Sequence, residues 1–134
     1  MSKTISDITA NLTIEDFTVQ GGKPILNNKA GVPGMLLVWM LQCGHCHRFI
    51  PTMQSVSKKL NSRSITFPCV AIESEELKKD GGKLSNALGV QGYPTILFFG
   101  SDGKVLANYE QGRDENTLLG NICSVYHQCV EKNL

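Results

Sequence analysis

The chain has 134 residues, with 13 basic and 12 acidic side chains and a formal net charge of +1. This length fits one domain that buries roughly two thirds of its unfolded surface. The near-neutral charge gives no basis for binding nucleic acid or an anionic membrane, and no apolar stretch reaches the roughly 20 residues of a membrane span. Five cysteines are too few, and odd in number, for a disulfide scaffold.

The first 34 residues, taken as an N-terminal lead-in to residues 35–130, carry one clear pattern. Residues 16–20 alternate as a strand does, Gly21-Gly22 suits a tight turn, and residues 23–26 are expected to return as the partner strand. The lead-in therefore predicts a β-hairpin.

The central segment predicts a strand, a helix and a second strand. Residues 35–41 are apolar throughout, as expected for a strand buried on both faces of a parallel sheet. After Cys43 the spacing becomes helical, and Pro51 is expected to kink the helix. Residues 65–72 predict the second strand. The apolar stripe of the helix is formed by Phe49, Met53, Val56 and Leu60.

The second half continues this alternation. Residues 75–88 are helical in composition but broken by Gly81-Gly82, and residues 95–99 and 105–109 predict an antiparallel hairpin. Asp114 is placed to cap a last helix. The apolar stripe of that helix is formed by Leu118, Ile122, Val125, Tyr126 and Cys129.

The predicted order is β-α-β-α-β-β-α within one domain spanning residues 1–134. Strand–helix alternation requires parallel crossovers, whereas the last hairpin requires an antiparallel pair. The fold class is therefore α/β, with a mixed central sheet flanked by helices on both faces.

Cys43-Gly44-His45-Cys46 lies at the predicted junction between strand and helix. Two cysteines separated by two residues can close a disulfide and reopen it, because the short turn keeps the sulfurs close. At a helix start, free backbone N–H groups and the positive end of the helix dipole stabilise a thiolate. The motif predicts a redox pair, with Cys43 as nucleophile and Cys46 as the residue that resolves the mixed disulfide.

Three further features follow this motif in order. Pro51 lies five residues after Cys46, Tyr93-Pro94-Thr95 follows a glycine-containing turn, and Gly112 follows the last predicted strand. In this combination the chain resembles the thioredoxin superfamily over residues 35–130, and its Cys-Gly-His-Cys motif is similar to the active site of protein disulfide isomerase domains. The resemblance implies a thioredoxin fold, a cis peptide bond before Pro94, and structural roles for Pro51 and Gly112.

The same resemblance implies roles around the cysteines. Gly44 and His45 would tune the pKa and the redox potential, and a protonated His45 would favour the Cys43 thiolate and make the pair a better oxidant. The expected activity is that of a thiol–disulfide oxidoreductase on protein, peptide or small-molecule disulfides, with no cofactor or metal and with a reductase or glutathione as recycling partner. The expected substrate-binding residues are Gln42, Tyr93, Pro94 and Thr95.

Four positions depart from the usual residues of the family. Gln42 replaces a tryptophan, His47 replaces a lysine, and Gln91 replaces an arginine in the loop before Pro94. Leu37 replaces a buried carboxylate that accepts the proton of the second cysteine. These departures predict a more polar substrate contact and a mixed disulfide that forms readily but is resolved slowly.

Other chemistries fit part of the motif. Residues 43–47 also satisfy the Cys-x-x-Cys-His pattern of c-type haem attachment, although that function leaves Tyr93-Pro94-Thr95 unexplained. A closed zinc site needs four ligands, and Cys123 and Cys129 lack the spacing to complete one. The main alternative is a non-catalytic or regulatory thioredoxin-fold binding module, which has little need of both cysteines.

The remaining residues are expected to be structural or at the surface. Buried packing is the default for Cys69 and Cys129, Trp39 is expected in the core with a hydrogen-bonded indole, and Cys123 is either packing or a regulatory thiol. His127 and residues 73–79 are expected at the solvated surface. Residues 1–12 lack the pattern of a secretory signal, so a cytosolic monomer is expected.

Overall fold

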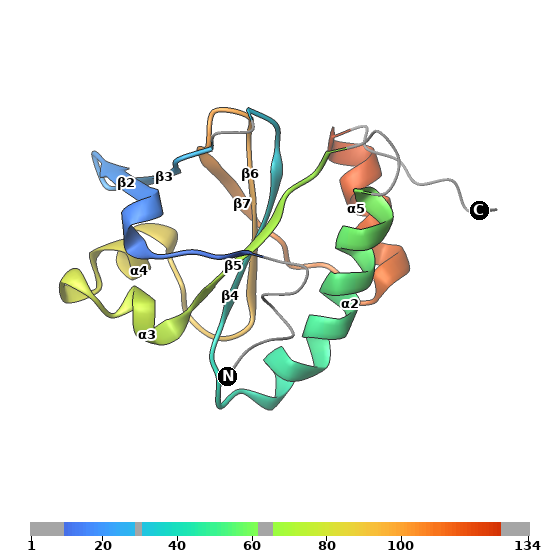
Figure 1. The fold of residues 1–134 in the computed structure, drawn as a ribbon, viewed down its shortest axis with the longest axis horizontal. Coiled ribbons are helices and arrows are strands. Elements are labelled where there is room, and N and C mark those ends of the chain that lie inside the picture. The colour runs from blue at the N-terminus through green and yellow to red at the C-terminus, as the bar shows by residue number, and fades with distance from the viewer. Residues whose placement is uncertain (1–9, 29–30, 62–65, 127–134) are drawn as a thin grey trace.

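The computed structural model describes residues 10–28, 31–61 and 66–126. Its central sheet has five strands in the order β1-β5-β4-β6-β7 (Figure 1). Strand β4 pairs in parallel with β5 and antiparallel with β6, so the predicted mixed sheet is confirmed. The strands are β1 (Ala10–Asn11), β4 (Gly34–Trp39), β5 (Cys69–Glu73), β6 (Thr95–Phe99) and β7 (Val105–Asn108).

The predicted N-terminal hairpin is present as β2 (Phe17–Gln20) and β3 (Lys23–Leu26), which pair antiparallel. Its turn is Gly21-Gly22, with φ of 58° and 77°, a region that glycine enters at little steric cost. A short 3₁₀ helix, η1 (Ile14–Asp16), precedes the hairpin. The N–H group of Leu26 donates to the carbonyl of Gly103 at 2.8 Å and so ties the hairpin to the turn before β7.

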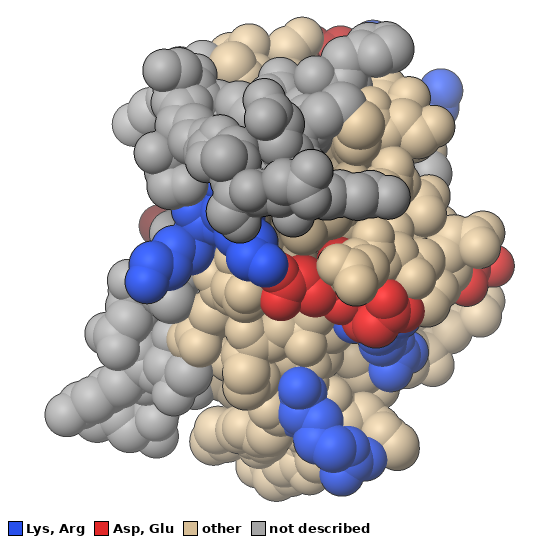
Figure 2. Space-filling view, turned by 90° about the vertical axis from the view of Figure 1, so that its right-hand side faces the viewer, with Lys and Arg blue, Asp and Glu red and all other residues tan. Residues whose placement is uncertain are grey.

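Two long helices cover one face of the sheet, and the hairpin with the shorter helices covers the other (Figure 1). The long helices are α2 (Gly44–Leu60), which continues through Pro51, and α5 (Glu115–Tyr126). The shorter ones are α3 (Ser74–Leu77), the 3₁₀ helix η2 (Asp80–Gly82) and α4 (Lys83–Leu88). Lys59 and Glu115 form an ion pair between α2 and α5. Figure 2 shows basic and acidic side chains near one another on one face of the molecule.

Strand β4 separates two apolar cores. All six of its residues are buried, as expected for a strand covered on both sides. Because successive side chains of a strand point to opposite faces, Leu37 packs in the core under α2 and α5, whereas Leu36 packs in the core under the hairpin, α3 and α4. The predicted apolar stripe of α2, from Phe49 to Leu60, is buried in the first of these cores.

The predicted breaks and caps are also found. Gly81 and Gly82 have φ of 66° and 74° and interrupt the segment between α3 and α4. Asp114 accepts a hydrogen bond from the N–H group of Thr117 at 3.0 Å and caps α5. Among the described residues, no helix is long and apolar enough to cross a bilayer.

Four sequence predictions of the fold need correction. The buried strand predicted over residues 35–41 ends at Trp39, and Leu41 lies exposed in the turn that follows. Strand β5 begins at Cys69 rather than at residue 65, because Pro68 has no N–H group to donate to a neighbouring strand. Val125 is 56% exposed, since Tyr126 takes the inward position in the last turn of α5 and packs on Phe67 and Phe98. The indole N–H of buried Trp39 has no hydrogen-bond partner among the described residues.

Candidate active site

The Cys43–Cys46 pair lies where β4 gives way to α2, at the lower end of α2 in Figure 1. A turn follows β4, closed by a 3.0 Å hydrogen bond from the N–H group of Cys43 to the carbonyl of Met40. Cys43 is the N-cap of α2, and its sulfur accepts a hydrogen bond from the N–H group of Cys46 at 3.3 Å. The nucleophile proposed from the sequence is therefore in contact with the unsatisfied donors at the helix start.

Cys43 is half-buried and its pKa is lowered from the ordinary value of 9.0. The largest cause is a hydrogen bond from the Cys46 thiol, and partial burial, which raises the pKa, opposes it. The backbone N–H groups of Cys46 and His45 and the positive charge of Arg113 lower the pKa further. The hydrogen bonds from Cys46 and His45 and the charge of Arg113 favour the reactive, anionic form of Cys43. The neutral thiol can instead donate to the carbonyl oxygen of Tyr93, which lies 3.6 Å away.

Cys46 has the opposite environment. Its side chain is fully buried, and burial, followed by the hydrogen bond to Cys43, raises its pKa to about 12. It is therefore a thiol near neutral pH and donates to its partner. Both residues are free cysteines. Their environments favour Cys43 as the attacking sulfur and Cys46 as the sulfur that reacts second.

The loop before β6 meets the cysteines as predicted. The Tyr93–Pro94 peptide bond is cis. Pro94 and Thr95 are buried, and the Thr95 hydroxyl donates to the carbonyl of Gly92 at 2.7 Å. Of the four residues predicted to bind substrate, only Gln42 and Tyr93 therefore present accessible side chains beside Cys43.

The positive side-chain charge that lowers the Cys43 pKa comes from Arg113, whereas His45 contributes through its backbone N–H group. Nη2 of Arg48 lies 2.7 Å from Nδ1 of His45. A guanidinium has donors only, so Nδ1 accepts this hydrogen bond. The tuning role that the sequence analysis gave to a protonated His45 stays a prediction.

The other predicted positions fall around the pair. Leu37 has no exposed surface and shares the buried cluster of Cys46, so no carboxylate stands at that position. The carbonyl of Gly112 accepts a 2.5 Å hydrogen bond from the Tyr109 hydroxyl, consistent with a structural role for Gly112. Gln91 is exposed.

The other cysteines lie elsewhere. Cys69 is buried, as predicted, and burial raises its pKa to about 12. Cys123 on α5 is disulfide-bonded, so the expectation of a packed or regulatory free thiol at this position was wrong. Cys129 and His127 fall outside the described residues.

Sequence reasoning missed two residues of the site. Arg113 directly follows the predicted Gly112, and its charge lowers the pKa of both sulfurs. Glu73, assigned to a solvated face, instead accepts a 3.0 Å hydrogen bond from the N–H group of Leu41 in the turn before Cys43. Glu73 is the last residue of β5, which runs parallel to β4, and it pairs with Trp39 at the end of β4. Because parallel strands end at the same edge of a sheet, this position could have indicated that Glu73 lies near the turn before Cys43.

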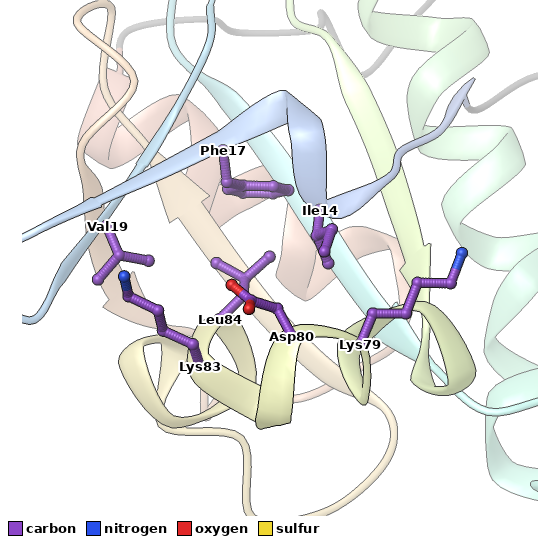
Figure 3. Close-up of a pocket in the computed structure, with 7 residues that line it drawn as sticks. All are labelled: Ile14, Phe17, Val19, Lys79, Asp80, Lys83 and Leu84. Carbon is purple, nitrogen blue, oxygen red and sulfur yellow. The ribbon is translucent and has the colours of Figure 1, made fainter.

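A cavity of about 160 Å³ lies on the opposite face of the sheet, between the hairpin and the segment around α4 (Figure 3). Its floor is apolar, and charged side chains stand at its margin. None of its lining residues is a cysteine, and the cavity is separate from the cysteine pair. The lining residues are Ile14, Phe17, Val19, Lys79, Asp80, Lys83 and Leu84.

A mixed sheet, a Cys-x-x-Cys pair at the start of α2 and a cis proline facing it define a redox protein of the thioredoxin class. The sequence profile of the Thioredoxin family matches residues 25–124, so the chain belongs to the thioredoxin family.

Curated relatives include a thioredoxin and several protein disulfide isomerases. Thioredoxin of Borreliella burgdorferi is 33% identical over 98 residues, which cover 70% of this chain and 78% of that protein. Human Protein disulfide-isomerase A6 is 28% identical over 102 residues, which cover 72% of this chain and 22% of that protein. The chain thus spans about a fifth of the length of the disulfide isomerases it matches.

Solved structures agree on the fold. The J-Trx1 fragment of ERdj5 superposes with a TM-score of 0.67 at 17% identity, covering 92% of this chain and 55% of that one. Thioredoxin f from spinach chloroplast superposes with a TM-score of 0.62 at 16% identity, covering 87% of this chain and 91% of that one. The predicted thioredoxin fold is confirmed.

Proposed function

We propose that this chain is a thiol–disulfide oxidoreductase that exchanges disulfides with protein or small-molecule substrates through Cys43 and Cys46. The observation that carries the proposal is the asymmetry of the pair. Cys43 is accessible and its pKa is lowered, whereas Cys46 is fully buried with a pKa raised to about 12. A non-catalytic binding module would have no use for this asymmetry.

In the first step the Cys43 thiolate attacks one sulfur of a substrate disulfide. The new bond joins Cys43 to that sulfur, and the old substrate bond breaks with its electron pair on the other sulfur, which leaves as a thiolate and takes a proton from solvent. The N–H group of Cys46, 3.3 Å from the attacking sulfur, stabilises the thiolate before attack.

In the second step Cys46 loses its proton and attacks the Cys43 sulfur. The mixed disulfide breaks, the second substrate thiolate leaves and is protonated, and Cys43 and Cys46 are joined. The substrate has gained two electrons and two protons, and the protein has lost them. A dithiol or two molecules of glutathione restore the reduced pair by the same exchange in reverse.

The second step is the slower one under this proposal. Cys46 is a thiol near neutral pH, and Leu37 in the same buried cluster offers no base to remove its proton. The proton then leaves by way of water, a group on the substrate or another nearby base. Mixed disulfides should therefore persist long enough to be trapped.

Equilibration in glutathione redox buffers, followed by alkylation and mass measurement, tests the proposal. We expect Cys43 and Cys46 to interconvert between dithiol and disulfide with a single midpoint. A midpoint at the potential of the glutathione pool or above it favours an oxidase or isomerase, and a much more reducing midpoint favours a reductase. The measurement is sensitive, because a difference of 30 mV in potential corresponds to about 1.4 kcal/mol for this two-electron couple. A pair that does not interconvert would instead favour the binding module.

Trapping with variants assigns the two roles. Cys46→Ser should accumulate mixed disulfides with substrates, whereas Cys43→Ser should not. Accumulation by Cys43→Ser instead would reverse the assignment. The cytosolic location and monomeric state expected from the sequence stay predictions, to be checked by fractionation of cells and by sedimentation.

A further inference from the structure

Leu41 is an exposed apolar side chain beside the nucleophile. It lies two residues before Cys43 and is 43% exposed. The other exposed large apolar side chains among the described residues are Leu106 on β7 and Val125 on α5. Residue 42, between Leu41 and the nucleophile, is a glutamine. The apolar surface next to the nucleophile on this side is thus supplied by Leu41.

The N–H group of Leu41 is bound by a side chain of the central sheet. It donates to Oε2 of Glu73 at 3.0 Å, and Glu73 pairs with Trp39, the last residue of β4. The carboxylate is itself fixed by two more donors, the Ser74 hydroxyl at 3.0 Å and the N–H group of Glu75 at 2.7 Å. A carboxylate with three donors has little freedom to turn away.

The carbonyl group of Leu41 is bound by a side chain of α2. Nε2 of His47 lies 2.6 Å from this oxygen, and since a carbonyl can only accept, Nε2 carries the proton. The imidazole also stands edge-to-face with the indole of Trp39, with 6.2 Å between ring centroids and 84° between planes. Both backbone polar groups of Leu41 are therefore bound by side chains from different elements, β5 and α2.

We infer that Leu41 is the specificity-determining apolar contact of the site, with Glu73 and His47 as its positioning residues. This inference rests on the proposed function. The favoured substrates are peptide or protein disulfides with an apolar side chain next to the attacked cysteine. Burial of exposed apolar surface favours such a complex, and a backbone that is already fixed loses less entropy on binding.

The rate of attack on two matched peptide disulfides tests the inference. Each short peptide carries one cysteine as a mixed disulfide with 2-nitro-5-thiobenzoate, whose release is followed by absorbance; one has leucine next to the cysteine and the other has serine. Ellman's reagent serves as a small disulfide without a peptide. The proteins compared are the reduced wild type, Leu41→Ser and Leu106→Ser, the last as a matched exposed leucine on β7.

We expect Leu41→Ser to slow attack on the leucine peptide by roughly fivefold, the order expected for losing partial burial of a leucine. The serine peptide, Ellman's reagent and Leu106→Ser should all keep wild-type rates. Equal rates for both peptides in the wild type, or an equal loss on both in Leu41→Ser, would overturn the inference while leaving the exchange activity standing. No release from any of the three disulfides would instead overturn the proposed function and this inference with it.

The positioning role of His47 is tested by rescue. His47→Ala should reduce the preference for the leucine peptide, and His47→Gln, whose amide can donate to the Leu41 carbonyl, should restore most of it. Rates with Ellman's reagent should change little in either variant. Loss of the preference in His47→Gln as well as His47→Ala, or its retention in both, would remove His47 from the account.

Discussion

Arg48 donates a hydrogen bond to Nδ1 of His45 across 2.7 Å, and this contact engages the side chain of a residue that lies between the two cysteines in the sequence. The His45 imidazole is not among the groups that lower the Cys43 pKa. The stabilisation of the Cys43 thiolate comes from the Cys46 thiol, from the backbone N–H groups of the first turn and from Arg113.

His45→Asn should therefore leave the pH midpoint of Cys43 alkylation unchanged. The backbone N–H group of residue 45, through which His45 lowers the Cys43 pKa, remains in this variant. Arg113→Gln, which removes a charge, should raise the midpoint. A rise of about one pH unit or more in His45→Asn, the size expected for a lost imidazolium, would show that the ring is charged. The measurement is the rate of iodoacetamide labelling of reduced protein against pH.

Cys46→Ala should move the pH midpoint of Cys43 labelling upward, toward 9.0, because the hydrogen bond from the Cys46 thiol is the largest cause of the lowered pKa. In the wild type the folded chain releases the Cys43 proton at lower pH than the unfolded chain. The Cys43 thiolate thus adds stability as pH rises through the window between the lowered pKa and 9.0, and this contribution is lost as pH falls through it. Cys69→Ala is the control and should leave the midpoint unchanged; an unchanged midpoint in Cys46→Ala would contradict the assignment.

Leu37→Asp should lower the melting temperature and speed resolution of the mixed disulfide. A carboxyl group buried without partners costs a few kcal/mol, but its carboxylate can accept the Cys46 proton. Leu36→Asp is the matched control, because Leu36 is equally buried on the same strand but faces the other core. It should be destabilised without faster resolution. Equal stopped-flow rates for Leu37→Asp and the wild type would show that proton transfer from Cys46 is not limiting.

Gly103→Ala should destabilise the fold by about 2–4 kcal/mol, the range for substitutions that force overpacking or strain a left-handed backbone. Gly103 has φ of 86°, and a Cβ there would overlap the carbonyl oxygen of Leu26 in β3. Gly120→Ala, within α5 and with nothing close to its Cβ position, should be neutral or stabilising. Urea denaturation measures both, and equal stabilities would argue against close contact of the hairpin with the turn before β7.

The parts of this protein that follow a local pattern could be predicted from the sequence. The apolar run of β4 and the helical spacing of four, three and four residues in α2 indicate their burial, and the Cys43–Cys46 spacing indicates the site. Strand β1 could not be predicted, because two residues show no periodicity. Glu73 and Arg113 could not be placed either, since they reach the site from segments far along the chain and act through backbone groups or through charge.

The two cores have a further consequence for how this chain can change. Leu36 and Leu37 are neighbours in sequence, yet they belong to different apolar clusters. The sheet in which β4 pairs with β5 and β6 separates these two clusters. Substitutions on the hairpin side and on the cysteine side share few contacts, so their effects on stability should add. The hairpin and its cavity can thus be remodelled, by selection or by design, while the chemistry on the other side of the sheet is kept.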